Sequence, residues 1–137
     1  MIADSSVLID FVGRQKGRAW HLLEAALSAR DVVCITPEIL QETLQGARSD
    51  THFQSLRRGL IRFTCLTSPD IAADAAAAAR LYASARWVGI TPRSPLDCAI
   101  AVAAVRHGIA LLTEDRDFEA LRRVEPRLKL IDIPRFS

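Results

Sequence analysis

Met1-Ile-Ala-Asp4-Ser-Ser-Val-Leu-Ile9 opens the chain with a short apolar run, an acidic residue and the beginning of a helical pattern. The same order occurs late in the chain, where the apolar run Ile109-Ala-Leu-Leu-Thr113 is followed by Asp115, Asp117 and a helical pattern. Alternation of short apolar runs with helical patterns is typical of a parallel sheet covered by helices. We therefore expect an α/β fold in which acidic residues follow the strands.

This alternation continues along all 137 residues, about the length of one domain, so we predict a single domain over 1–137. The apolar runs predict strands at about 1–4, 32–35, 63–67, 109–113 and 128–133. The periodic segments predict helices near 6–12, 18–30, 37–47, 51–61, 69–86, 95–107 and 116–124. Together they predict three α/β/α layers around a central parallel sheet of four to five strands.

Several helix ends can be predicted from single residues. Thr36-Pro37, Ser68-Pro69 and Ser94-Pro95 each place a hydroxyl at a helix N-cap and proline at the first helical position. Gly46 and Gly108 suit the left-handed residue that ends a helix. These boundaries decide which acidic residues have a structural explanation.

Composition excludes several classes of protein. No apolar stretch approaches the roughly 20 residues that cross a bilayer, and the N-terminus lacks the features of a signal peptide, so we expect a cytoplasmic protein without a membrane anchor. The cysteines Cys34, Cys65 and Cys98 have neither a CxxC nor a Cys/His metal spacing. Cys34 and Cys65 lie in strand-like runs, which predicts reduced core residues.

The net charge of 18 − 16 = +2 does not by itself predict nucleic-acid binding. If the acidic residues gather in one crevice, however, the remaining surface is more basic than this total. Basic side chains could then flank the crevice and bind a phosphate backbone. The candidates are Arg14, Lys16, Arg18, Arg57, Arg58, Arg62, Arg86 and Arg93. For any single one of them a solvated helix face is the favoured interpretation.

Two acids are explained by their helices. Glu38 follows Pro37 and Asp70 follows Pro69, so each is expected in a first helical turn, where the helix dipole favours a negative charge. Glu42 is too far into its helix to be a cap. It shares a face with Ile39, which predicts either a desolvated acid that meets a cation or, alternatively, a solvated side chain.

Asp97 has two possible roles. Ser94-Pro-Leu-Asp97 fits a capping box, but the almost wholly apolar helix that follows must be buried, which directs this carboxylate toward the sheet. Asp4 and Asp115 could each be an N-cap, and Asp115-Arg-Asp117 can present two carboxylates to one ion. The carboxyl ends of parallel strands form one crevice, where converging carboxylates need a cation such as Mg²⁺.

Four motifs in this order resemble the PIN-domain ribonucleases, and more closely the VapC-type toxins of bacterial toxin–antitoxin pairs. The resemblance covers essentially the whole chain. The motifs are Ile2-Ala-Asp4-Ser-Ser-Val-Leu-Ile-Asp10, Pro37-Glu-Ile-Leu-Gln-Glu42-Thr-Leu-Gln-Gly46, Ser94-Pro-Leu-Asp97-Cys-Ala-Ile-Ala and Leu111-Leu-Thr-Glu-Asp115-Arg-Asp117-Phe.

The resemblance implies a PIN-like fold and an endoribonuclease that depends on Mg²⁺ or Mn²⁺. It also implies a homodimer, a VapB-type antitoxin whose tail occupies the acidic groove, and a larger complex with that antitoxin. The implied catalytic residues are Asp4, Glu42, Asp97, Asp115 and Asp117. All of these except Glu42 are implied metal ligands, and the implied supporting hydroxyls are Ser6, Ser94 and Thr113.

The expected chemistry is hydrolysis of RNA phosphodiester bonds by a water that the metal activates, without a protein nucleophile. Two alternatives stay open at this point. One is a non-catalytic binding module in which the acids cap helices and dock a basic tail, and the other is a DNA structure-specific nuclease. The sequence does not identify the RNA, its cleavage site or the number of metal ions.

Overall fold

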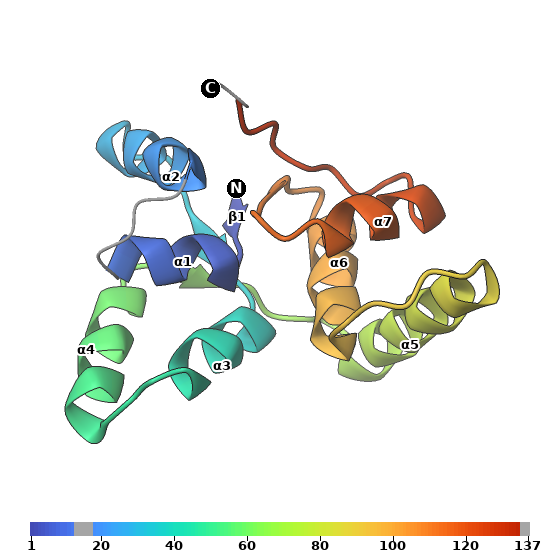
Figure 1. Cartoon of the computed structure of the whole chain (residues 1–137), viewed down its shortest axis with the longest axis horizontal. Helices are drawn as coiled ribbons and strands as arrows, with labels where there is room; N and C mark the ends of the chain where they lie inside the picture. Colours follow the sequence, from blue (N-terminus) through green and yellow to red (C-terminus); the bar gives the residue numbers. More distant parts are fainter. Residues whose placement is uncertain (13–17, 135–137) are drawn as a thin grey trace.

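Residues 1–12 and 18–134 are described by a computed structural model, shown in Figure 1. They form one parallel sheet with the strand order β3-β2-β1-β4. The four strands are short, namely β1 Ile2–Ala3, β2 Cys34–Ile35, β3 Thr64–Cys65 and β4 Leu111–Leu112. The predicted parallel sheet is therefore confirmed, and its strands are shorter than the apolar runs suggested.

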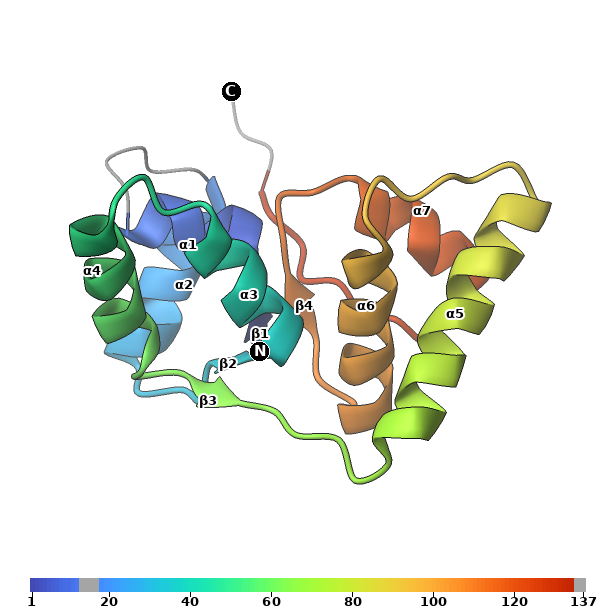
Figure 2. The same ribbon diagram turned by 90° about the horizontal axis from the view of Figure 1, so that it is seen from below.

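Helices cover the sheet on both sides, as Figures 1 and 2 show, with α1 to α4 on one side and α5 to α7 on the other. Their bounds are α1 Ser5–Val12, α2 Arg18–Ser28, α3 Pro37–Gln45, α4 Asp50–Leu60, α5 Ile71–Trp87, α6 Pro95–His107 and α7 Asp117–Val124. This is the predicted three-layer α/β/α arrangement.

The topology explains where polar residues gather. Ile2 of β1 pairs with Cys34 of β2 and with Leu111 of β4. Because all these strands are parallel, the residues that follow them lie at one edge of the sheet. Asp4 follows β1 and Thr113 follows β4. The sheet thus brings residues from the two ends of the sequence together, while a core of buried, mainly aliphatic side chains holds the sheet and helices in place.

Some predicted boundaries are wrong. Helix α5 begins at Ile71 with Asp70 as its N-cap, and not at Ser68-Pro69, because the Asp70 carboxylate accepts a hydrogen bond from the Ala73 N–H. Asp70 is consequently a cap and not a first-turn residue. The predicted fifth strand is an isolated bridge between Leu111 and Leu130.

Two further expectations fail at single residues. Gly46 ends α3 with φ −80°, which is not left-handed, whereas Gly108 ends α6 with φ +65°, as expected. Cys65 is exposed because β3 lies at the edge of the sheet, whereas Cys34 is buried, and both are free thiols. No helix in the described ranges is long and apolar enough to span a membrane.

Candidate metal centre

Asp4 lies between β1 and α1 and is 2% exposed. Its Oδ2 accepts hydrogen bonds from the hydroxyls of Ser6 (2.9 Å) and Thr113 (2.8 Å). Its Oδ1 is buried and has no hydrogen-bond partner among the described residues. Burial raises the pKa of Asp4, and the hydrogen bonds oppose that shift. A buried carboxylate oxygen without a partner is unfavourable, and a bound cation would satisfy it.

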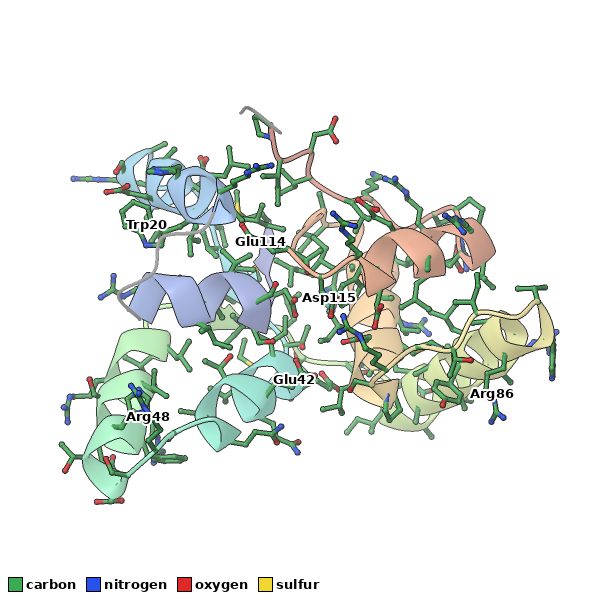
Figure 3. All side chains as sticks on the ribbon, in the orientation of Figure 1. Trp20, Glu42, Arg48, Arg86, Glu114 and Asp115 are labelled. Atoms are coloured by element: carbon green, nitrogen blue, oxygen red, sulfur yellow. The ribbon has the colours of Figure 1, made fainter. Side chains whose placement is uncertain are left out.

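Glu42 reaches the same region from the second turn of α3. Its Oε2 accepts a hydrogen bond of 2.9 Å from the Ser5 hydroxyl at the start of α1. Partial burial, and after it the negative charges of Asp4, Asp115 and Glu38, raise the pKa of Glu42. Figure 3 shows Glu42 and Asp115 in the space between the two groups of helices. Glu42 is therefore partly buried and held by Ser5, which differs from the fully solvated side chain of the second interpretation.

Asp97 is the third residue of α6 and is 4% exposed. Burial raises its pKa to about 7, and the charges of Asp115, Asp4, Glu42 and Asp117 contribute in that order. All four other candidate acids thus lie close enough to Asp97 to disfavour its negative charge. Burial and the neighbouring charges thus favour the protonated form of Asp97 in the metal-free protein.

Asp115 lies in the turn between β4 and α7, Asp117 is the first residue of α7, and both are partly buried. Oδ1 of Asp115 accepts a hydrogen bond of 2.9 Å from the Asp117 N–H, which fixes the turn. The Arg93 guanidinium bridges both carboxylates, with Nη2 2.9 Å from Asp115 Oδ1 and Nε 2.9 Å from Asp117 Oδ2. The sequence suggested that two carboxylates one residue apart can face one ion, and here they face a guanidinium.

The acids fit a divalent cation. One carboxylate oxygen from each of Asp97, Asp115 and Asp117 lies within 4.8 Å of the others. Asp4 is outside this group of three, but its charge acts on Asp97, and its buried Oδ1 has no hydrogen-bond partner among the described residues. Such an all-oxygen donor set suits a hard cation such as Mg²⁺ or Mn²⁺.

The predicted supporting hydroxyls fall into two groups. Ser6 and Thr113 lie against Asp4, and the Thr113 hydroxyl also accepts a hydrogen bond of 3.0 Å from the Asp115 N–H. Thr113 thus links Asp4, which follows β1, to Asp115, which follows β4. The Ser94 hydroxyl instead accepts a hydrogen bond of 3.2 Å from the Leu96 N–H, which is a helix cap.

The basic residues named from the sequence do not form one group. Arg93 contacts the acids, whereas Figure 3 shows Arg86 on α5 well away from Asp115. Arg14 and Lys16 lie outside the described residues. Glu38 is in the first turn of α3, as predicted.

Sequence reasoning overlooked two polar contacts and one cavity. Ser5, which donates a hydrogen bond to Glu42, is adjacent to the predicted Ser6. Its contact with α3 joins two segments that are far apart in the sequence, so no local pattern indicates it. Glu114 accepts a hydrogen bond of 2.8 Å from the Ala19 N–H and so caps α2. A mainly apolar cavity of about 890 Å³ lies along α3, β3, α5 and α6, and its lining contains none of the five clustered acids.

Comparison with known proteins relates the chain to others in sequence and in fold. The profile of the PIN domain family matches residues 1–124. Ribonuclease VapC11 of Mycobacterium tuberculosis is 38% identical over 97 residues, which is 71% of this chain and 70% of that protein. The VapC ribonuclease Mb1587 of Mycobacterium bovis matches over the same length at the same identity.

Solved structures share the fold at lower identity. VapBC2 of Rickettsia felis bound to a promoter DNA fragment has a TM-score of 0.73 at 17% identity, covering 95% of this chain and 96% of that chain. DNA-bound VapBC of Salmonella typhimurium has a TM-score of 0.71 at 21% identity, covering 97% of each chain. A toxin–antitoxin complex of Klebsiella pneumoniae has a TM-score of 0.64 at 24% identity, covering 98% of each chain.

Proposed function

The chain belongs to the PIN domain family, and we propose that it is a VapC-type endoribonuclease toxin that depends on a divalent metal. The observation that carries this proposal is the convergence of five carboxylates at one edge of the sheet, from α3, α6, the start of α7 and the turns after β1 and β4. They are Asp4, Glu42, Asp97, Asp115 and Asp117. Such a cluster is strongly unfavourable in a partly buried site unless a cation neutralises it.

The proposed ligands of a Mg²⁺ ion, with Mn²⁺ as a substitute, are Asp4, Asp97, Asp115 and Asp117. When bound, such an ion activates a water as nucleophile and stabilises the charge that develops on the phosphate. Ser6 and Thr113 orient Asp4 by donating to its Oδ2, which leaves Oδ1 available as a ligand. Asp97 must lose its proton to become a ligand, so metal affinity is coupled to pH.

Glu42 has a different proposed role. The Ser5 hydroxyl holds one of its oxygens, and its raised pKa suits a carboxylate that accepts a proton from the attacking water. No protein nucleophile is needed, since water attacks the phosphodiester bond.

RNA is the proposed substrate, in keeping with the named ribonucleases to which the chain is related, and the cytoplasm is the proposed compartment.

A VapB-type antitoxin is the proposed partner, because toxin–antitoxin complexes share this fold. The contact of Arg93 with Asp115 and Asp117 supports an arginine in the antitoxin tail, since a guanidinium fits between these carboxylates.

We also propose a homodimer, which light scattering of the purified protein tests. Exposed large apolar side chains such as Ile71 and Trp87 of α5 are suited to protein contacts.

The test is cleavage of a mixture of labelled RNAs by the pure protein. We expect cleavage with Mg²⁺ or Mn²⁺, none in EDTA, and recovery when the metal is added back. A single-stranded DNA and a flap DNA of matched sequence serve as controls. Cleavage of the DNA alone would favour a DNA nuclease, and absence of cleavage at every metal concentration would favour a non-catalytic binding module.

A further inference from the structure

Arg93 combines an exposed side chain with contacts to two candidate metal ligands. It lies in the loop 88–94 between α5 and α6, and its side chain is 75% exposed. Its Nε and Nη2 donate to Asp117 and Asp115, and its backbone N–H lies 3.3 Å from Asp117 Oδ2. The loop is therefore attached to the acidic site at the backbone as well as through the side chain.

Two ion pairs elsewhere in the described part of the chain have plain structural roles. Arg106 pairs with Asp74 and joins α6 to α5. Arg127 pairs with Glu125 two residues before it and stabilises a turn. Neither pair includes a member of the acidic cluster. Arg93 differs because it contacts two of the three residues whose carboxylate oxygens lie within 4.8 Å of one another.

A guanidinium and a divalent cation compete for these oxygens. Asp115 Oδ1 and Asp117 Oδ2 both accept hydrogen bonds from Arg93. Arginine does not lose its proton in proteins, so it cannot share the site as a neutral group. Two positive charges that contact the same carboxylates repel each other, and an exposed ion pair is weak. Metal binding is therefore expected to displace the side chain.

The displaced guanidinium would stay beside the site. Pro92, the preceding residue, is buried, and Ser94 caps α6, so the backbone on both sides of Arg93 is held in place. Side-chain rotation alone can move the charge from the carboxylates toward solvent. A phosphate backbone that approaches the metal would meet it there, and guanidinium groups bind phosphate oxygens in a bidentate manner.

We propose that Arg93 is a phosphate-binding residue that rests on Asp115 and Asp117 in the metal-free protein and binds the RNA backbone when metal takes their place. This rests on the proposed function. The contact keeps two clustered negative charges neutralised before metal binds. It also makes nucleic-acid binding through Arg93 dependent on metal.

The first experiment titrates Mn²⁺ alone into wild type and Arg93→Gln by calorimetry. Removing the competing guanidinium should strengthen Mn²⁺ binding by about two- to fivefold. The matched control is Arg127→Gln, which removes an arginine that is 76% exposed and pairs with a carboxylate outside the cluster. It should leave Mn²⁺ affinity unchanged. Weaker Mn²⁺ binding by Arg93→Gln would overturn the proposal, because Arg93 would then order the ligands.

The second experiment measures binding of a labelled, cleavage-resistant phosphorothioate RNA by fluorescence anisotropy, in EDTA and in Mn²⁺. We expect Arg93→Gln to match wild type in EDTA and to bind roughly tenfold more weakly in Mn²⁺. Its slope of log affinity against log salt should fall by about one unit. Arg93→Lys, which keeps the charge and loses the bidentate geometry, should lie between them.

Equal RNA affinity of wild type and Arg93→Gln in Mn²⁺ would overturn the proposal, as would the same loss in EDTA. Both experiments are independent of catalysis. If wild type binds Mn²⁺ and RNA as described but cleaves no RNA, the proposed function fails while the role of Arg93 stands. Circular dichroism confirms that each variant is folded.

Discussion

Asp4 and Glu42 on one side of the acidic cluster are held by neutral hydroxyl groups, whereas Asp115 and Asp117 on the other side are held by a cation. Ser6 and Thr113 donate to Asp4, and Ser5 donates to Glu42. On the opposite side Arg93 bridges both carboxylates from an exposed loop. The charges of acids on both sides act on Asp97, whose pKa burial raises to about 7.

This difference separates a preorganised half of the site from an exchangeable half. A hydroxyl donor leaves the charge of a carboxylate in place and fixes which oxygen faces the site, so it is compatible with a bound metal. A guanidinium neutralises the same charge that a metal would neutralise, so it must leave. We expect changes at the hydroxyls that hold the proposed ligand Asp4 to lower metal affinity and changes at Arg93 to raise it.

Replacing the acid on which both sides act should have the largest effect. Asp97→Asn removes a proposed metal ligand and should lower metal-dependent RNA cleavage at least about 100-fold. It also removes a desolvated carboxylate, so the metal-free variant should be more stable than wild type at pH 7.5. Cleavage rates and thermal denaturation check the two parts. An active Asp97→Asn variant would remove this residue from the metal site.

Thr113→Val should break the link between the two sides. The change keeps the shape of the side chain but removes the donor to Asp4 and the acceptor for the Asp115 N–H. Mn²⁺ affinity should fall about 10- to 100-fold, as is usual when a group that orients a ligand is lost. Thr113→Ser keeps the hydroxyl and is the control. Equal loss in both variants would mean that packing of the methyl group, and not the hydrogen bonds, explains the effect.

The stability of the metal-free protein should depend on pH through protonation of Asp97. The pKa of Asp97 is about 7 in the folded protein and 3.8 without the fold, so the metal-free fold binds this proton more tightly than the unfolded chain does. This contribution is therefore full below about pH 4 and is lost as pH rises through about 7, by on the order of 4 kcal/mol. Asp4 and Glu42 shift in the same direction.

Chemical denaturation of the metal-free protein at pH 5 and pH 7.5 measures this loss. Asp97→Asn should show a clearly smaller difference between the two pH values than wild type. If the difference is the same in both proteins, other groups are responsible, and the cluster does not hold its proton at Asp97.

The smallest effect is expected on the hydroxyl side at Ser5. Ser5→Ala removes one hydrogen bond to Glu42, which should lower RNA cleavage roughly three- to tenfold with little change in Mn²⁺ affinity. Glu42→Gln should lower cleavage further, since it removes the carboxylate itself. A loss of Mn²⁺ affinity in Ser5→Ala as large as in Thr113→Val would show that Glu42 is a metal ligand.

The sequence predicted the fold and the acids more completely than their contacts. Alternating apolar runs and helical patterns place Asp4 and Asp115 after parallel strands, and parallel strands end at one edge, so their convergence follows from topology. The position of Glu42 inside α3, with no capping role, marked it as unusual. These inferences rest on periodicity and on capping chemistry, which are local properties of the chain.

Contacts between distant segments could not be predicted in this way. The hydrogen bond from Ser5 to Glu42 depends on how α1 packs against α3, and the bridge from Arg93 depends on the path of the loop before α6. Cys65 was misassigned because a short apolar run does not reveal whether its strand is central or at an edge. The cavity beside β3 has no sequence signature, since it depends on the gap between helices.

Calorimetric titration of Mn²⁺ into wild type and Asp97→Asn, both at pH 7.5 and without RNA, tests most directly whether the acidic cluster contains a metal site. We predict saturable binding by wild type that is lost or at least about 100-fold weaker in the variant. Indistinguishable titrations of the two proteins, or no binding by folded wild type at millimolar Mn²⁺, would contradict a metal centre at this edge of the sheet.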